Sequence, residues 1–293
     1  MTFVTVGVPV FNGADQLRES LECLLSQSHA DIHIRIYDNA STDATPDIAR
    51  EFERRDSRVT LVRHPENIRA MPNFLRIVQD CETPYVMWRA HDDLSSQNYI
   101  ETLLSALQSN PKAHLAIPII TSRWNDGSTY DIPPTHPTGG NFVSDTQNLL
   151  MHSHPAWFYG LWSRDALLPV FDMALRNFPV GWAFDHLVLF PFLINRRTVA
   201  ASEATFIHRL FEKSYKGKPV NEVPLAVFKR IYQLFFKQCL QFINESDLSI
   251  AHKLYLKLHL RKYTDIKVYK IKKIKQGKIF KNGVPASIAS SEF

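Results

Sequence analysis

The first 120 residues alternate between short apolar segments with strand character and longer segments with helical spacing. Residues 3–10 are rich in β-branched side chains, and residues 32–38 alternate apolar and polar positions as a strand does. Between these segments, leucines follow the i, i+4, i+7, i+8 spacing of one helix face: Leu17, Leu21, Leu24 and Leu25. The same reasoning predicts further strands at 59–63, 85–88 and 115–120, and further helices beginning near Pro46, at 70–81 and at 98–107.

This alternation is typical of an α/β fold in which helices flank a mostly parallel, twisted sheet. Ligands of such sheets bind outside the carboxyl ends of the strands. Polar residues follow the predicted strands at these ends: Asn12, Asp38, Asp92 and Asp93. We therefore expect one cleft that brings these residues together.

The second half of the chain gives a weaker pattern. Residues 122–153 contain PPTHP and TGG and keep no long period, so we expect loops or an elaboration that faces the acceptor there. Residues 225–243 carry apolar side chains at helical spacing with interspersed Lys and Arg, which predicts an amphipathic helix.

Composition indicates an ordinary globular protein. The chain has 293 residues, of which 45% are hydrophobic, enough for about two domains or one domain with an extension. Its three cysteines are scattered, which suits a reducing compartment. No basic region precedes the first apolar residues, and no stretch reaches the ~20 apolar residues that span a bilayer. We expect a cytoplasmic location.

The turn after the first strand, VPVFNGAD, excludes two common nucleotide sites. A dinucleotide-binding sheet needs G-x-G-x-x-G at this turn, and the chain also lacks a Walker A motif. Nor does the turn carry the basic residues with which a nucleotidyltransferase would hold a triphosphate. A nucleotide bound by this sheet must be held by other groups.

Four segments, taken in order and spacing, resemble the inverting glycosyltransferases of family 2, which have a GT-A fold: VGVPVFNGADQLRESLECLLSQ, IYDNASTDAT, RHPENIRAMPNFLRIV and YVMWRAHDD. The resemblance covers roughly the first 120 residues and weakens beyond residue 155. It implies a transferase domain over residues 1–215, with a nucleotide-sugar half (1–120) and an acceptor half (121–215). Residues 216–293 would form a helical, basic extension.

The resemblance implies that the segment after the first strand lines the nucleotide base: Pro9, Val10, Phe11 and Asn12. The alternative for Phe11 is core packing. The acid that ends the second strand, Asp38, would accept a hydrogen bond from the base, or it closes a turn in its own loop. Asn67 and Arg69 lie where the family places a loop near the nucleotide. Glycine is usual at the position of Arg69, which could contact the diphosphate or lie on the surface.

The D-x-D motif of the family falls on Ala90, His91 and Asp92, so its first acid is missing. Asp92, with Asp93 beside it, would hold Mn²⁺ or Mg²⁺, which neutralises the departing diphosphate. From the residues alone, two adjacent carboxylates favour either a cation between them or a shared proton. The alternative is a solvated acidic loop that caps a helix beginning near Ser96.

Downstream, VGWAFDHLVLF resembles the segment whose acid serves as catalytic base in the family, and Asp185 is the candidate, with His186 as its competitor. Asp185 could instead complement a helix dipole. In ATFIHRLFEKS the register is ambiguous between His208, a candidate third metal ligand, and Arg209. Four aromatic residues could stack on the acceptor or pack in the core: Trp157, Phe158, Tyr159 and Trp162.

The predicted function is transfer of a single sugar from a nucleoside-diphosphate sugar of the UDP or dTDP type to a saccharide or lipid-linked saccharide, in bacterial surface polysaccharide assembly. The processive members of the family carry a Q-x-x-R-W motif, which is absent here.

Positive charge is concentrated near the C-terminus. Between Ala251 and Asn282 the chain has eleven Lys or Arg and one acid, Asp265, although the whole chain carries only +5. This basic tail fits peripheral attachment to an anionic membrane at the cytoplasmic face. A nucleic-acid binder that acts through the tail and its tyrosines is the rival class, but it leaves the carboxylates unexplained. A tail that only packs or oligomerises the protein is a third possibility.

Overall fold

The computed structural model describes residues 3–135, 140–210 and 225–269. The chain divides into two compact units, and each is described by itself. The sheet unit consists of Met1–Pro134, Ala156–Asp172 and Thr198–Leu210. The helical unit consists of Thr135–Pro155, Met173–Arg197 and Phe211–Phe293.

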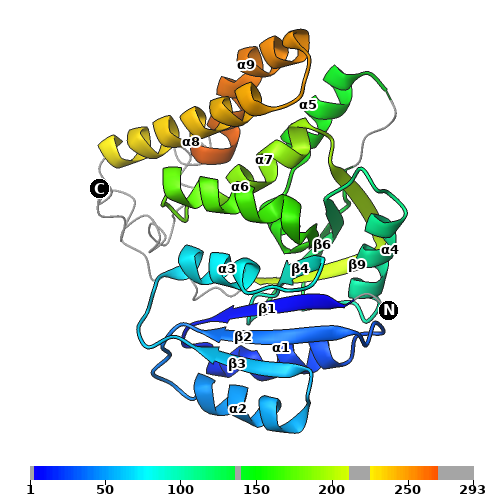
Figure 1. Ribbon diagram of the computed structural model, residues 1–293, viewed down its shortest axis with the longest axis vertical. Coiled ribbons are helices and arrows are strands. Elements are labelled where there is room, and N and C mark those ends of the chain that lie inside the picture. The colour runs from blue at the N-terminus through cyan, green and yellow to red at the C-terminus, as the bar shows by residue number, and fades with distance from the viewer. Residues whose placement is uncertain (1–2, 136–139, 211–224, 270–293) are drawn as a thin grey trace. The chain divides into compact units, whose positions relative to one another are not determined.

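Within its described residues, the sheet unit contains one sheet of nine strands in the order β3-β2-β1-β4-β8-β6-β9-β5, with β7 paired to β6. Figure 1 labels β1, β2, β3, β4, β6 and β9 of this sheet. The strands are β1 (Val4–Val10), β2 (Ile32–Asp38), β3 (Val59–Arg63), β4 (Tyr85–Trp88), β5 (Leu94–Ser95), β6 (Leu115–Trp124), β7 (Thr129–Ile132), β8 (Leu161–Ser163) and β9 (Thr198–Leu210). The first four strands in this order are mutually parallel, as β6 and β9 are. The predicted α/β fold is confirmed.

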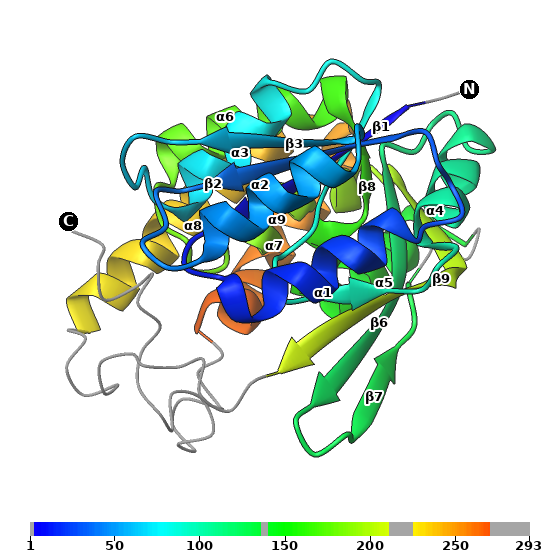
Figure 2. The same ribbon diagram turned by 90° about the horizontal axis from the view of Figure 1, so that it is seen from below.

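Helices cover the parallel part of the sheet. They are α1 (Ala14–Leu25), α2 (Thr45–Arg55), α3 (Ala70–Gln79) and α4 (Tyr99–Gln108). Helices α1 and α2 lie side by side, and α2 packs along β2 and β3, whereas α3 packs along β1 and β2 (Figure 2). Every residue of β1 is buried. This burial explains its near-continuous apolar sequence, because a central strand of a parallel sheet is covered on both faces.

An aromatic cluster fills the core beside β4. Trp88 stacks on Phe158 with 4.3 Å between ring centroids, and Phe171 lies 5.5 Å from Trp88. Trp157 and Trp162 are fully buried and Phe158 nearly so, so these three side chains pack in the core.

The helical unit contains α5 (Phe142–His152), α7 (Phe184–Ile194), α8 (Leu225–Glu245), α9 (Ile250–Thr264) and a π-helical turn, Asp265–Tyr269, and α6 (Arg164–Asn177) begins in the sheet unit. The expectation of loops throughout 122–153 was wrong. The β6–β7 hairpin covers the first part of that range, and α5 the last. Helix α5 begins where Asn141 Oδ1 accepts a hydrogen bond from the Ser144 amide, and its buried positions follow helical spacing.

The predicted helix over 225–243 is present as α8. No helix within the described residues is long and apolar enough to cross a bilayer. The helical unit has residues on both sides of residue 215, because it includes 135–155 and 173–197 as well as 211–293, whereas the sheet unit ends at Leu210. The transferase domain and C-terminal extension divided there stay a prediction.

Gly7 in β1 permits the close approach of α3. A Cβ atom at Gly7 would lie 2.1 Å from Cγ2 of Ile77, whose side chain is fully buried. We expect Gly7→Ala to lower the free energy of unfolding by about 1–3 kcal/mol through overpacking. Urea denaturation of Gly7→Ala, Ile77→Ala and the double variant measures this, and the double variant should lose less stability than the sum of the single changes. Simple additivity would contradict the contact.

Candidate active site

A pocket of about 340 Å³ opens in the sheet unit at the carboxyl ends of β1 and β4. This volume lies within the range of small-molecule sites. It is lined by Pro9, Val10, Phe11, Asn39, Asn67, Ala70, Asn73, Phe74, Ala90, His91, Asp92 and Tyr159. Five of the predicted nucleotide-binding residues are therefore together: Pro9, Val10, Phe11, Asn67 and Asp92.

The loops after β1 and β2 are joined by hydrogen bonds. Asn12 has a positive φ of 51°, and its Oδ1 accepts from the Thr42 amide at 2.8 Å. The Asn12 amide donates to Ser41 Oγ at 2.9 Å, and the Gly13 amide donates to Thr45 Oγ1 at 2.9 Å. Asn12 does not line the pocket and instead holds the two loops in register.

Asp38 also acts within its own loop. Its side chain is fully buried, with Oδ1 accepting from the Ser41 amide at 3.0 Å and Oδ2 3.1 Å from Arg63 Nε. The geometry is that of the turn-closing alternative, and Asp38 is not among the pocket residues. Its contact with a base stays a prediction. By contrast, Phe11 lines the pocket and is 46% exposed, so its ring is not a core residue.

Asn39 is a pocket residue that sequence reasoning missed. Its Nδ2 donates to Asn67 Oδ1 at 3.0 Å, and its Oδ1 accepts from the Ile68 amide at 2.9 Å. These bonds tie the loop after β2 to the loop before α3. The sequence signal that could have identified Asn39 was its position next to Asp38, at the carboxyl end of a predicted strand. His91 could have been identified in the same way, because it lies next to Asp92.

Asp92 and Asp93 have different surroundings. Asp92 lines the pocket, whereas Asp93 is only 3% exposed and its Oδ1 accepts from the Arg209 amide at 2.8 Å. Burial, reinforced by the charge of Asp92, raises the pKa of Asp93 to about 7. Asp93 thus retains its proton more readily than an exposed carboxyl does.

Strand β9 carries both His208 and Arg209, between which the sequence left the register ambiguous. The Arg209 guanidinium donates through Nε to the Asp92 carbonyl and pairs through Nη1 with Glu19. His208 lies close enough for the charge of Asp92 to affect it, but burial dominates and lowers the pKa of its imidazole. Within the described ranges, no cluster of three or more His, Cys, Asp or Glu side chains is arranged to hold a metal ion. The set Asp92, Asp93 and His208 therefore does not form a three-ligand site in this structure.

Behind the carboxylates lies a fully buried arginine. Arg89 Nη2 donates to Ser95 Oγ at 2.7 Å, and the guanidinium carbon lies 5.5 Å from the ring centroid of Tyr99 and 5.6 Å from that of Phe206. Such contacts stabilise a buried cation. The positive charge of Arg89 also opposes the rise in the pKa of Asp93.

The candidate base, Asp185, belongs to the helical unit. It lies in the first turn of α7, directly after Ala183 with its positive φ of 60° and Phe184, and its Oδ1 accepts from the His186 amide. Trp182 Nε1 donates to the Val268 carbonyl at 2.9 Å, and Tyr263 Oη donates to the His186 carbonyl at 3.2 Å. The C-terminal helices therefore fix the segment that carries Asp185.

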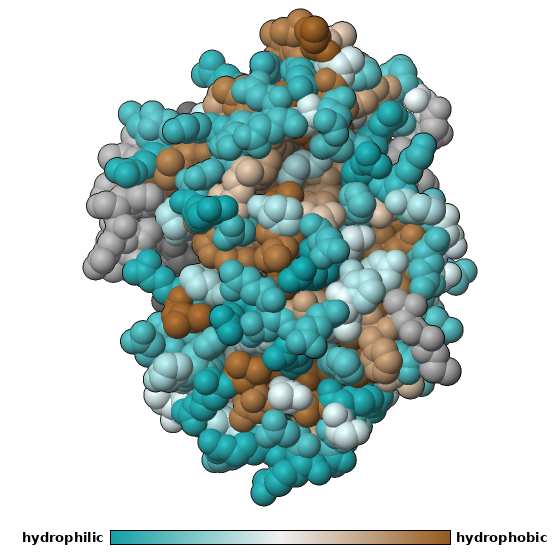
Figure 3. All heavy atoms as spheres, viewed as in Figure 1, coloured by the Kyte–Doolittle hydropathy of each residue, from teal (hydrophilic) through white to brown (hydrophobic). Residues whose placement is uncertain are grey.

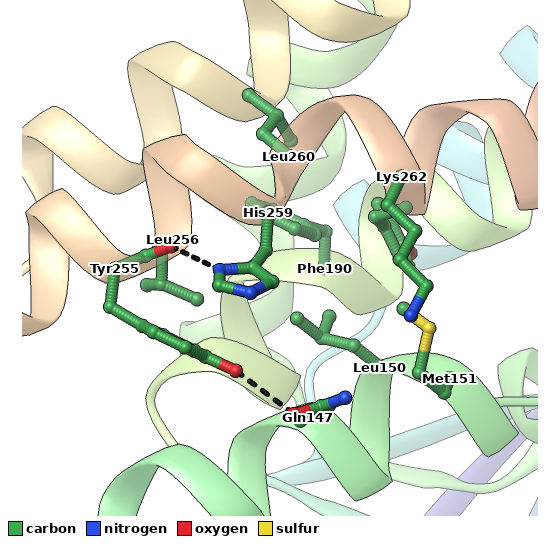
Figure 4. A pocket seen from close by; sticks show the side chains of 10 residues that line it. Gln147, Leu150, Met151, Phe190, Tyr255, Leu256, His259, Leu260 and Lys262 are labelled. Atoms are coloured by element: carbon green, nitrogen blue, oxygen red, sulfur yellow. Dashed lines mark hydrogen bonds between the residues drawn. The ribbon is translucent and has the colours of Figure 1, made fainter.

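A second pocket lies within the helical unit, among α5, α7 and α9 (Figure 4). Tyr255 Oη donates across it to Gln147 Oε1 at 3.1 Å, and His259 Nδ1 lies 2.9 Å from the Tyr255 carbonyl. Its volume is about 20 Å³, and its lining is largely apolar. A space of this size holds about one water molecule, so it is a packing defect and not a substrate site.

Comparison with known proteins now identifies the family. The model of "Glycosyl transferase family 2" matches residues 5–160. The chain belongs to this family. Glycosyltransferase GlyG of Streptococcus pneumoniae is 30% identical to this family 2 chain over 252 residues, covering 80% of the chain and 79% of GlyG. Glycosyltransferase GlyA of the same species is 32% identical over 100 residues, which represent 34% of the chain but only 14% of GlyA.

Two solved structures share the fold of this family 2 chain. S. aureus TarS 1-349 in complex with UDP-GlcNAc has a TM-score of 0.62 at 15% identity, over 96% of this chain and 78% of TarS 1-349. The mannosyltransferase PcManGT of Pyrobaculum calidifontis, in complex with GDP-Man and Mn²⁺, has a TM-score of 0.57 at 16% identity, over 98% of this chain and 77% of PcManGT. The predicted GT-A fold is confirmed.

Arg69 immediately precedes α3 with a φ of 73° and a ψ of 165°, a region that residues other than glycine rarely adopt. Arg69→Gly should therefore raise the free energy of unfolding by about 1 kcal/mol in urea denaturation. Arg69→Ala is the matched control, because it removes the guanidinium and keeps the strain. If the guanidinium contacts a diphosphate, both variants weaken nucleotide binding equally. Equal stability of the two variants would contradict the strain.

Proposed function

We propose that this family 2 glycosyltransferase is a metal-dependent, inverting enzyme that transfers one sugar from a nucleoside-diphosphate sugar to a hydroxyl of a saccharide or lipid-linked saccharide. The observation that carries the proposal is the pocket at the ends of β1 and β4, which has the Phe11 ring and the Asp92 carboxylate among its lining residues. An aromatic ring suits a base, and a carboxylate suits the cation that accompanies a diphosphate.

The donor proposal rests on the polar and aromatic lining of the pocket. Phe11 offers a ring face, and Asn39 and Asn67 offer amide groups beside it. The complex of TarS 1-349 with UDP-GlcNAc supports a UDP-type donor for a chain of the same fold, and dTDP is the close alternative. We propose that Pro9 and Val10 complete the wall against the base.

The residues present fit a divalent cation held jointly with the substrate. Mg²⁺ and Mn²⁺ in such sites take one or two protein ligands and the oxygens of a diphosphate. Asp92 is the carboxylate at the pocket, and the lowered pKa of His208 favours the neutral imidazole that a metal requires. PcManGT binds GDP-Man and Mn²⁺ on the same fold. When bound, the cation would neutralise charge that develops on the leaving diphosphate.

The proposed transfer proceeds by in-line displacement. An acceptor hydroxyl oxygen bonds to the anomeric carbon of the donor as the bond from that carbon to the diphosphate oxygen breaks. The bonding electron pair leaves with the diphosphate, and the configuration at the anomeric carbon inverts. We propose that the Asp185 carboxylate accepts the hydroxyl proton, with His186 as the alternative base.

The rival function, nucleic-acid binding through the basic tail, receives no support from the described structure. Six of the eleven basic residues fall outside the described residues: Lys270, Lys272, Lys273, Lys275, Lys278 and Lys281. The rival would also leave the pocket without a role. The transferase proposal gives the pocket a substrate, so we retain it alone.

Calorimetric titration with UDP, dTDP, GDP and CMP, each with and without Mn²⁺, tests the donor site. We expect one nucleoside diphosphate to bind in a Mn²⁺-dependent manner, and Asp92→Asn to weaken that binding by about tenfold or more because a charged ligand is lost. Asp47→Asn is the matched control, since Asp47 is an exposed acid on α2 paired with Arg50. Absence of binding by all four nucleotides would overturn the proposal.

Asp185→Asn should lower kcat about 10²- to 10⁴-fold while nucleotide binding is retained, because only the proton acceptor is lost. We expect His186→Gln to lower kcat less than Asp185→Asn does, and this comparison distinguishes the two candidate bases. NMR of the product formed by the wild-type enzyme reports the anomeric configuration. Retained configuration would exclude the single-displacement step.

A further inference from the structure

Helix α9 exposes a row of large aliphatic side chains. Ile250 is 80% exposed, Leu254 57% and Leu258 80%. They are spaced four residues apart, so they form one stripe along the helix. Figure 3 shows hydrophobic atoms over the α8–α9 end of the helical unit. Isolated exposed leucines are ordinary, but a continuous stripe on one helix marks an interaction surface.

The stripe is additional to the face that packs α9 into its own unit. Leu256, Leu260 and Tyr263 are buried, and they anchor the helix against the rest of the helical unit. A surface helix of a globular protein usually has one apolar stripe and a polar outer face. Helix α9 has apolar residues on both its inner and its outer side, so folding of this unit leaves one apolar stripe without cover among the described residues.

The charges beside the stripe are all of one sign. Lys253, Lys257, Arg261 and Lys262 lie within α9, and the helix contains no Asp or Glu. Lys257, Arg261 and Lys262 are exposed. An aliphatic stripe flanked by Lys and Arg is the composition of helices that lie in the interface of an anionic bilayer.

We propose that α9 docks the protein on an anionic lipid surface, with Ile250, Leu254 and Leu258 inserted among the acyl chains and the flanking Lys and Arg on the headgroups. This inference deepens the proposed function and rests on it in one respect, namely that a lipid-linked acceptor would be presented at such a surface. The charge complementarity selects lipid over a second copy of this chain, since two copies of α9 would bring like charges together.

The test is sedimentation of the full chain with vesicles of phosphatidylcholine alone or mixed with phosphatidylglycerol. We expect binding only to the mixed vesicles, and a loss of about tenfold or more in partition for Leu254→Gln/Leu258→Gln, with the tail intact. Tyr130→Gln is the matched control, because Tyr130 is 62% exposed on β7 and lies in the other unit. It should bind as the wild type does.

The dependence of vesicle binding on salt concentration distinguishes the hydrophobic from the electrostatic contribution. The Leu254→Gln/Leu258→Gln variant should lose affinity at every ionic strength, whereas Lys257→Gln/Arg261→Gln should lose mainly the component that salt screens. Unchanged partition of the leucine variant would overturn the proposal. So would sedimentation showing a wild-type dimer that the leucine variant abolishes, or a binding preference for duplex DNA over mixed vesicles that depends on the same leucines.

Nucleotide binding, measured on the same preparations without vesicles, keeps the two proposals distinguishable. The leucine variant should bind nucleotide as the wild type does, because the pocket residues all lie in the sheet unit. If the leucine variant loses vesicle binding but still binds nucleotide, the substitutions have affected the surface of α9 and not the nucleotide pocket. Vesicle binding without any nucleotide binding would support the proposal for α9 and contradict the proposed nucleotide-sugar site.

Discussion

The link between β9 and the segment after β4 determines the chemistry of the pocket. The Arg209 amide donates to the buried Asp93 carboxyl, and the Arg209 side chain donates to the Asp92 carbonyl while it pairs with Glu19. Because Arg209 holds the backbone carbonyl of Asp92 and the side-chain carboxyl of Asp93, the segment directs one carboxylate into the pocket and the next into the protein. The pairing of β5 with β9 holds the next two residues of this segment, Leu94 and Ser95, to the same strand.

Burial gives these neighbouring acids different electrostatic roles. Asp93 retains a proton up to about neutral pH because it is desolvated beside another carboxylate. Asp92 lines the pocket and Asp93 does not, so Asp92 is the acid within reach of a ligand. The buried guanidinium of Arg89 supplies positive charge on the protein side, where its Nη2 donates to Ser95 and the rings of Tyr99 and Phe206 lie beside it. Two adjacent carboxyl groups thus differ in burial and in their tendency to hold a proton.

The sequence predicted the parallel half of the sheet well, because continuous apolar strands and helical spacing are local signals. Strands 32–38, 59–63 and 85–88 agree with the structure at both ends. It failed where local signals mislead: TGG concealed the beginning of α5, whose cap is Asn141. In the site, Phe11 and Asp92 followed from position, but the orientation of Asp38 and Asp93 depends on hydrogen bonds to loops and to a distant strand. Sequence spacing carries no information about those partners.

The bond between Arg209 and Asp93 joins positions 116 residues apart in the chain. The contacts among β1, β2 and β3 are far more local, and local contacts form faster because shorter loops must be closed. As synthesis runs from the N-terminus, a chain complete only through β4 has the loops after β1 and β2 but lacks the strand that orients its acids. The nascent protein therefore acquires the wall of the pocket first and its reactive geometry last.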